Sequence, residues 1–201
     1  MKTQINLLVL LAVMLFSPVL QGQEIYKTVP AQSKVIIKGT STLHDWQMDA
    51  RSFKSEMVWD SSEKADPRIT NVSFVCKPSD IRSEHKLMDN KAHEALKVKQ
   101  FPEIRFRQSD VKIDPSPGSS FKGRLTGKLE IAGVSRNIEL PFTGEIKSKE
   151  TVSVSGSFKM KMSDFGITPP TAMMGTIKTG DEITLEYLFL MQSEKTLTTS
   201  K

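Results

Sequence analysis

Apolar and polar residues alternate throughout residues 121–162 and predict three consecutive strands there. Along the first, from Phe121 to Ile131, every second residue is apolar or glycine, and residues such as Lys122 and Arg124 stand between them. The same pattern returns at 138–146 and 152–162. A period of two over such lengths is typical of a strand with one buried and one solvent-facing side. We therefore expect a sheet that covers an apolar interior.

The rest of the chain predicts further strands and one helix. Residues 89–96 combine good helix formers with an apolar stripe at helical spacing, Asp89 or Asn90 is placed to cap the start, and Phe101-Pro102 ends the segment. A bend is expected at 42–45, a bulge at 108–110, and a long loop at 167–179. Strands are expected at 25–28, 33–43, 46–59, 72–76, 103–113 and 181–191.

Most successive strands are separated by short turns, and the helix does not alternate with strands as it would in a parallel sheet. The fold class is therefore all-β with one short helix. A strongly curved sheet or an antiparallel barrel of about eight strands fits this order best, and such a barrel holds either side chains or one small ligand.

Glycines recur on the apolar faces of the predicted strands, at Gly123, Gly127, Gly144 and Gly156. They can ease the sharp coiling that closes a barrel. Alternatively they leave an elongated apolar tube, whose lining would include adaptable methionines such as Met160. A tube of this kind suits a long, flexible hydrocarbon chain.

The chain divides into three parts by composition. Residues 1–22 start with a basic residue, continue with an apolar run too short for a comfortable membrane span, and are expected to be a cleaved signal peptide. Residues 23–195 are expected to form one barrel domain, and 196–201 a polar tail. The mature protein is then soluble and periplasmic or secreted.

Charge and cysteine content exclude some classes of partner and of stabilisation. The net charge of +5 is spread along the chain rather than concentrated, so no nucleic-acid partner is expected. Cys76 is the single cysteine, which leaves no disulfide, and its alternation with Phe74 predicts a buried thiol. We expect no cofactor.

Histidines offer the one candidate for catalysis or metal binding. His44-Asp45 lies at the expected bend, and His85 and His93 lie near the helix, but their spacing matches no paired-ligand motif. We therefore expect no metal and no catalytic residue. His44 remains a candidate for hydrogen bonding to the head group of a ligand.

Several stretches together resemble the YceI-like family of exported polyisoprenoid-binding proteins. They are residues 41–46 (STLHDW), 87–90 (LMDN), 101–106 (FPEIRF), 127–136 (GKLEIAGVSR) and 164–167 (DFGI). The resemblance implies an extended lipocalin-like barrel with an isoprenoid chain inside it. It also implies a set of ligand-binding residues on the inner wall and near the mouth: Trp46, Phe106, Leu125, Leu129, Leu140, Phe142, Phe158, Met160, Phe165 and Met174. His44, the candidate for the head group, completes the expected ligand-binding set.

The function expected is therefore binding rather than catalysis: a carrier or store for a long isoprenoid-type lipid, either a polyisoprenoid or a quinone. Transient membrane contact and a homodimer are compatible with the sequence. Two alternatives stay open. One is a hydrolase or isomerase that uses His44 and Asp45 on a hydrophobic substrate, and the other is a structural, stress-related exported domain with a closed core.

Overall fold

The computed structural model describes residues 23–60, 68–114 and 118–194. The predicted signal peptide and polar tail lie outside these residues. The described chain has one α-helix, α2 (Lys86–Ala95), and four short 3-10 helices, η1 (Pro30–Gln32), η2 (Pro78–Asp80), η3 (Met162–Phe165) and η4 (Met173–Gly175). Its strands are β1 (Gln23–Thr28), β2 (Lys34–Ser41), β3 (Trp46–Ala50), β4 (Phe53–Asp60), β5 (Arg68–Cys76), β6 (Ile81–Arg82), β7 (Ile104–Asp114), β8 (Ser120–Ile131), β9 (Val134–Ser148), β10 (Thr151–Lys161), β11 (Thr171–Ala172) and β12 (Ile177–Ser193).

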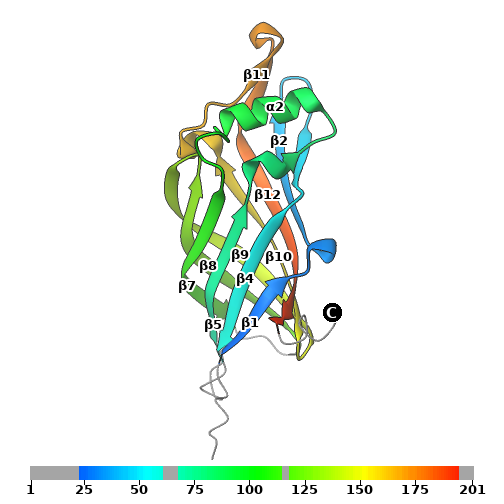
Figure 1. The fold of residues 1–201 in the computed structure, drawn as a ribbon, viewed down its shortest axis with the longest axis vertical. Helices are drawn as coiled ribbons and strands as arrows, with labels where there is room; N and C mark the ends of the chain where they lie inside the picture. The colour runs from blue at the N-terminus through cyan, green and yellow to red at the C-terminus, as the bar shows by residue number, and fades with distance from the viewer. Residues whose placement is uncertain (1–22, 61–67, 115–117, 195–201) are drawn as a thin grey trace, which may run out of the picture.

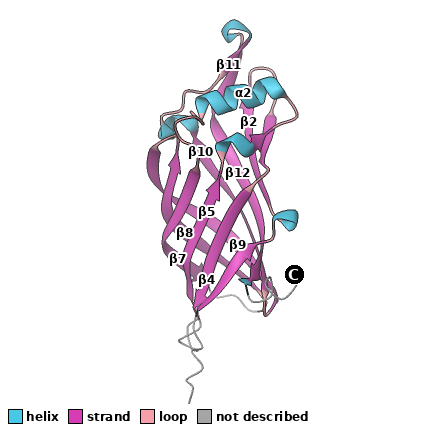
Figure 2. Ribbon diagram, in the orientation of Figure 1, coloured by secondary structure: helices cyan, strands magenta, loops and turns pink. Residues whose placement is uncertain are grey.

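Eight antiparallel strands close into a barrel. The order is β1-β4-β5-β7-β8-β9-β10-β12, and β12 pairs again with β1. The barrel is elongated, with α2 across its upper end and the start of β1 at its lower end (Figure 1). Figure 2 shows that strands make up the wall and that most of the helical segments gather at the upper end. The predicted all-β barrel with one helix is confirmed.

Strand β12 is long enough to pair with two strands along the same edge. Its last residues pair with β1, and its middle part pairs with β2 in the register Leu185↔Ile37. Strands β3 and β6 continue the sheet beyond β2. The upper half of the barrel therefore has a wall extended by β2, β3 and β6, next to α2.

The register of the strands defines a tight hairpin and confirms the predicted bulge. Strands β8 and β9 are joined by Ala132 and Gly133, whose φ angles of 49° and 80° are those of a two-residue type I′ hairpin. The pairing of β7 with β8 shifts between Gln108 and Asp110, where a bulge was expected.

The expected bend at 42–45 is a full reversal of the chain. Strand β3 returns antiparallel to β2, with Met48 opposite Ile37. The Ser41 hydroxyl donates to the carbonyl oxygen of His44 at 2.8 Å and accepts from the backbone N–H groups of Leu43 and His44. These bonds close a tight turn. The apolar–polar alternation after it therefore belongs to a separate strand, β3, and does not continue β2.

The helix also begins earlier than expected, at Lys86, so neither Asp89 nor Asn90 caps it. Asp89 is buried in its first turns and accepts hydrogen bonds from the backbone N–H (2.7 Å) and hydroxyl (2.8 Å) of Ser83. Burial, the largest influence, would raise the pKa of Asp89, but these bonds and the charge of Arg82 together lower it. The carboxylate thus ties the segment before α2 to the helix.

The glycines on the apolar faces are covered by aromatic rings. A Cβ added at Gly144 would lie 2.1 Å from the Phe121 ring, and one at Gly127 would lie 2.4 Å from the Phe106 ring. Each ring comes from the neighbouring strand, so the missing side chain is replaced across the sheet. The same holds for Gly39 with Trp46, Gly123 with Phe142 and Gly156 with Tyr187. The idea that these glycines leave the tube open is wrong.

Two apolar clusters divide the interior. The larger one lies in the upper part, under α2, and includes Phe106, Leu129 and Phe165. The smaller one fills the lower end and is built on Tyr26, Met57, Ile69, Val152 and Met191. The lower cluster packs across the floor of the barrel.

Candidate ligand-binding cavity

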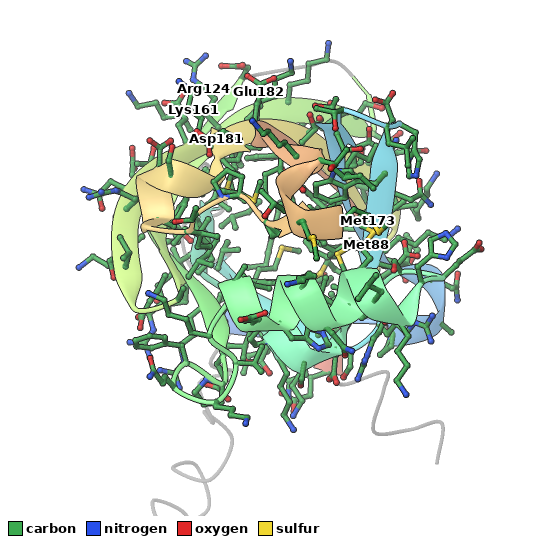
Figure 3. All side chains as sticks on the ribbon, turned by 90° about the horizontal axis from the view of Figure 1, so that it is seen from above. Met88, Arg124, Lys161, Met173, Asp181 and Glu182 are labelled. Atoms are coloured by element: carbon green, nitrogen blue, oxygen red, sulfur yellow. The ribbon has the colours of Figure 1, made fainter. Side chains whose placement is uncertain are left out.

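A cavity of about 480 Å³ lies inside the barrel. Its floor is formed by members of the lower cluster, including Met57, Ile69 and Met191. At the other end it is lined by exposed residues such as Leu43 and Leu87, so it opens beside α2. Figure 3 looks onto this end, with α2 and its Met88 at one side of the opening. The volume falls in the range of sites that hold small organic ligands, about 300–1,000 Å³.

The inner wall is apolar and incompletely covered. Leu125, Leu140, Met160 and Leu185 pack against the upper cluster and line the cavity, yet each is only half-buried. Core residues in a filled barrel would be buried by their neighbours. Their remaining exposed surface therefore faces the cavity, where an apolar ligand would cover it.

Most of the residues expected at the site do line the cavity. Trp46 of β3, Phe106 of β7 and Leu140 of β9 reach it from different strands because each faces inward on its strand. Contact with a ligand stays a prediction for all of them. The residues placed on the wall are His44, Trp46, Phe106, Leu125, Leu129, Leu140, Phe142, Met160 and Phe165.

Two expected residues lie off the wall. Phe158 is half-buried opposite Leu185 but does not line the cavity. Met174 is fully exposed, with a left-handed φ of 55°, because it lies at the tip of the segment between β11 and β12. Met174 therefore lies beyond the cavity wall, and its expected contact with a ligand stays a prediction.

A large share of the wall was not predicted from the sequence. Alternation along β5 and β12 already placed Phe74, Leu185 and Tyr187 on one side, and the helical stripe included Met88 and Ala92. The pattern did not show that the barrel closes and brings these apolar faces around one cavity. The additional wall residues include Phe74, Leu185, Tyr187 and Phe189 from the strands and Leu87, Met88, Lys91, Ala92 and Ala95 from α2.

Aromatic rings pack against one another along one side of this wall. Tyr187 and Phe189 stack with their centroids 5.5 Å apart, and Phe189 also contacts Phe53 and Phe74. The Tyr187 hydroxyl donates to the carbonyl oxygen of Pro141 at 2.9 Å. Burial raises the pKa of Tyr187, so the phenol stays neutral and keeps this bond.

Polar groups gather at the mouth and are basic or neutral. The basic side chains along the cavity are His44, His85, Lys91 and Lys161, and no carboxylate of the described residues lines it. The Nδ1 atom of His44 lies 2.6 Å from the carbonyl oxygen of Asp45. Because a carbonyl only accepts, Nδ1 carries a proton and Nε2 is left for another partner. This end of the cavity can therefore bind a polar or anionic head group.

The candidate catalytic groups do not assemble in the cavity. The Nε2 atom of His93 donates to the carbonyl oxygen of Ile81 at 2.9 Å, and His93 does not line the wall. Within residues 23–60, 68–114 and 118–194, no group of three or more histidine, cysteine or acidic side chains is placed to hold a metal ion. The histidines thus give no support to the hydrolase or isomerase alternative.

Cys76 is buried on the cavity wall, as the alternation predicts. Burial, followed by the negative charge of Asp80, raises the pKa of Cys76 to about 12. At pH 8 we expect the folded protein to react with an aromatic disulfide reagent about 1,000-fold more slowly than the unfolded chain, because the thiolate is the reactive form. Absorbance of the released thiol measures both rates, with guanidinium-unfolded protein as the reference. Similar rates in the two states would contradict the burial of this thiol.

In the part of the chain that the structure describes, none of the helices has the length and apolar character needed to cross a bilayer.

Solved structures with the same architecture come from several bacteria. The protein BcnA of Burkholderia cenocepacia is 19% identical with a TM-score of 0.62, and the match covers 81% of this chain and 98% of that chain. A polyisoprenoid-binding domain of Saccharophagus degradans, implicated in plant cell wall breakdown, is 10% identical with a TM-score of 0.62, and covers 84% and 98%. The YceI protein of Campylobacter jejuni is 24% identical with a TM-score of 0.55, and covers 73% and 84%. At these identities the likeness concerns the fold.

A search of curated proteins gives no match. A family model does match, described as the YceI-like domain, and it spans residues 26–189. This span contains nearly the whole barrel, from β1 to β12, with the cavity and its mouth. The chain therefore belongs to the YceI-like family.

Proposed function

We propose that this protein binds a long isoprenoid-type lipid in its barrel and carries or stores it outside the cytoplasm. The observation that supports this most directly is the cavity of about 480 Å³ with an almost wholly apolar wall. Membership of the YceI-like family and the fold shared with a polyisoprenoid-binding domain support the same ligand class. Export is proposed from the signal-peptide pattern of residues 1–22.

The shape of the cavity favours a chain over a compact ligand. The wall runs from the floor, at Met57 and Met191, to the mouth beside α2. An apolar chain that enters would remove its own surface and that of the wall from water, at about 25 cal/mol per Å² of apolar area. Methionines such as Met48 and Met160 on the wall can adapt to a branched chain, because the thioether side chain is unbranched and flexible.

A head group would lie at the mouth. His44, His85 and Lys91 surround that end, so an acidic or hydrogen-bonding head group would find partners there while the chain points to the floor. A phosphorylated polyisoprenoid and a quinone both meet this requirement. We propose that these residues act in binding and not in catalysis, because no carboxylate of the described residues lines the cavity beside them.

Native mass spectrometry of gently purified protein tests the proposal. We expect a bound apolar mass that denaturing conditions release, and an absorbance spectrum of the extract that separates a quinone from a polyisoprenoid. Repeated preparations from the native host without any bound mass would contradict lipid carriage.

A chain-length series provides a second measurement. Affinity for isoprenoid alcohols should rise by up to about fourfold for each methylene buried, since one CH₂ contributes about 0.8 kcal/mol, and should level off when the cavity is full. Affinity that does not depend on chain length would place binding outside the barrel.

A further inference from the structure

The most exposed large apolar side chains of the described residues gather at the mouth. Leu43 is 66% exposed, Leu87 64%, Met173 70% and Met174 108%. They belong to the β2–β3 turn, the start of α2, and η4. All three segments lie at the upper end of the molecule, and the segment with η4 projects furthest (Figure 1). Exposed apolar residues concentrated in one place indicate a contact surface. We call these four residues the rim.

Hydrogen bonds fix two of these segments to each other. The backbone N–H of Thr42 donates to the carbonyl oxygen of Lys178 at 3.0 Å, and the backbone N–H of Lys178 donates to the Thr42 hydroxyl at 3.1 Å. The same hydroxyl lies 3.4 Å from the carbonyl oxygen of Thr176. Leu43 and the two methionines are therefore presented by one braced structure and not by independent loops.

The backbone of η4 keeps its methionines outside. Met173 and Met174 have φ angles of 49° and 55°, and Gly175 follows at 87°. Residues with a Cβ adopt this left-handed region at a cost. Neither methionine belongs to an apolar cluster or to the cavity wall. Packing within the barrel thus does not stabilise the two methionines in this left-handed conformation.

The segment that carries Met173 and Met174 has charges suited to an anionic surface. Residues 167–180 contain one charged residue, Lys178, and no acid. Lys86 and Lys91 are exposed on α2, and His44 and His85 line the mouth. Acids also lie in the neighbouring segments, at Asp45, Glu84, Asp89, Glu94 and Asp181. Asp89 is buried against Ser83, Glu94 lies 3.9 Å from Lys91, and Asp181 accepts hydrogen bonds from Ser163.

We propose that the rim docks on the surface of an anionic phospholipid bilayer, with Met173 and Met174 inserted among the lipid chains. Narrow tips with apolar side chains between basic groups bind membranes by buried apolar area together with attraction to anionic lipids. Docking in this orientation places the mouth of the cavity against the bilayer. A lipid could then pass between membrane and cavity without crossing water, and this last step alone rests on the proposed function.

Co-sedimentation with vesicles made from equal parts of phosphatidylglycerol and phosphatidylcholine tests the docking. The wild type should bind these vesicles, and bind phosphatidylcholine vesicles less. The double variant Met173→Ser/Met174→Ser should bind at least about tenfold more weakly, because both inserted side chains are lost. Ile146→Ser is the matched control, since Ile146 is an exposed apolar residue outside the rim, on β9, and it should bind as the wild type does. Thermal unfolding should be the same for all three proteins.

A wild type that stays in the supernatant, or a double variant that binds like the wild type, would overturn the proposal. In the first case a concentration-dependent dimer in sedimentation velocity, lost in the double variant, would assign the rim to a second copy of the chain. Native mass spectrometry of the same samples keeps the two proposals separate. Protein that binds vesicles but never contains lipid would support docking and contradict lipid carriage. Protein that contains lipid but does not bind vesicles would support lipid carriage and contradict docking.

Discussion

Replacing Leu140 with tryptophan should lower the affinity for an isoprenoid chain at least about tenfold while the barrel remains folded. Leu140 is half-buried, lines the cavity and lies opposite Leu125, another wall residue. Extra atoms at a filled core position force strain on their neighbours. Here they can enter the space that the ligand needs, so the loss should appear in binding and not in stability.

A tryptophan on the outer side of the same strand is the matched control. Asn137 is exposed on β9, and Asn137→Trp should bind as the wild type does. Isothermal titration with an isoprenoid alcohol measures affinity, and thermal unfolding measures stability. Unchanged affinity in Leu140→Trp would show that the chain does not occupy this part of the barrel, whereas loss of folding would show that the wall there has no free space.

Adding one methyl group at Gly144 should destabilise the protein by about 1–3 kcal/mol, which is the cost typical of overpacking. The new Cβ would lie 2.1 Å from the Phe121 ring, and the nearest atoms all belong to that ring. Phe121 also meets Phe142 edge to face, with centroids 6.2 Å apart, so its displacement would lose this contact as well. Chemical denaturation monitored by circular dichroism measures the change.

A double-mutant cycle separates the clash from other effects of the substitution. Phe121→Ala removes the ring, so Gly144→Ala should cost much less in that background, with a coupling energy of about 1–2 kcal/mol. Equal costs in both backgrounds would show that Gly144 serves strand curvature and not the seating of Phe121.

Strict alternation made the strands of this protein predictable. In β8, β9 and β10 each buried position has a polar neighbour, so the face of these strands follows from the residues alone. The lengths of β8 and β10 follow as well, whereas β9 is longer than predicted, from Val134 to Ser148. Ala132-Gly133 joins two such strands, which is enough to indicate a hairpin. The barrel then follows from the number of strands and their short connections.

The way the glycines are used could not be derived from alternation. Alternation places Gly144 on the inner side, but the Phe121 ring reaches it from β8, and this contact depends on the register Phe121↔Gly144. A shift of register would pair the glycine with another residue. Likewise, Met174 belongs to an apolar pair in a proline-containing loop, and its left-handed backbone, which carries the side chain outward, leaves no periodic pattern.

The lower cluster of Tyr26, Met57, Ile69, Val152 and Met191 makes the cavity a blind tube. Tyr26 also donates its hydroxyl to the carbonyl oxygen of Lys149 at 3.0 Å, which ties β1 to the turn after β9. A guest that enters chain-first must leave head-first by the same opening, so uptake and delivery exclude each other in time. The net direction of transfer would then depend on how much lipid is available at the donor and at the acceptor that contact the mouth. The barrel itself would impose no direction.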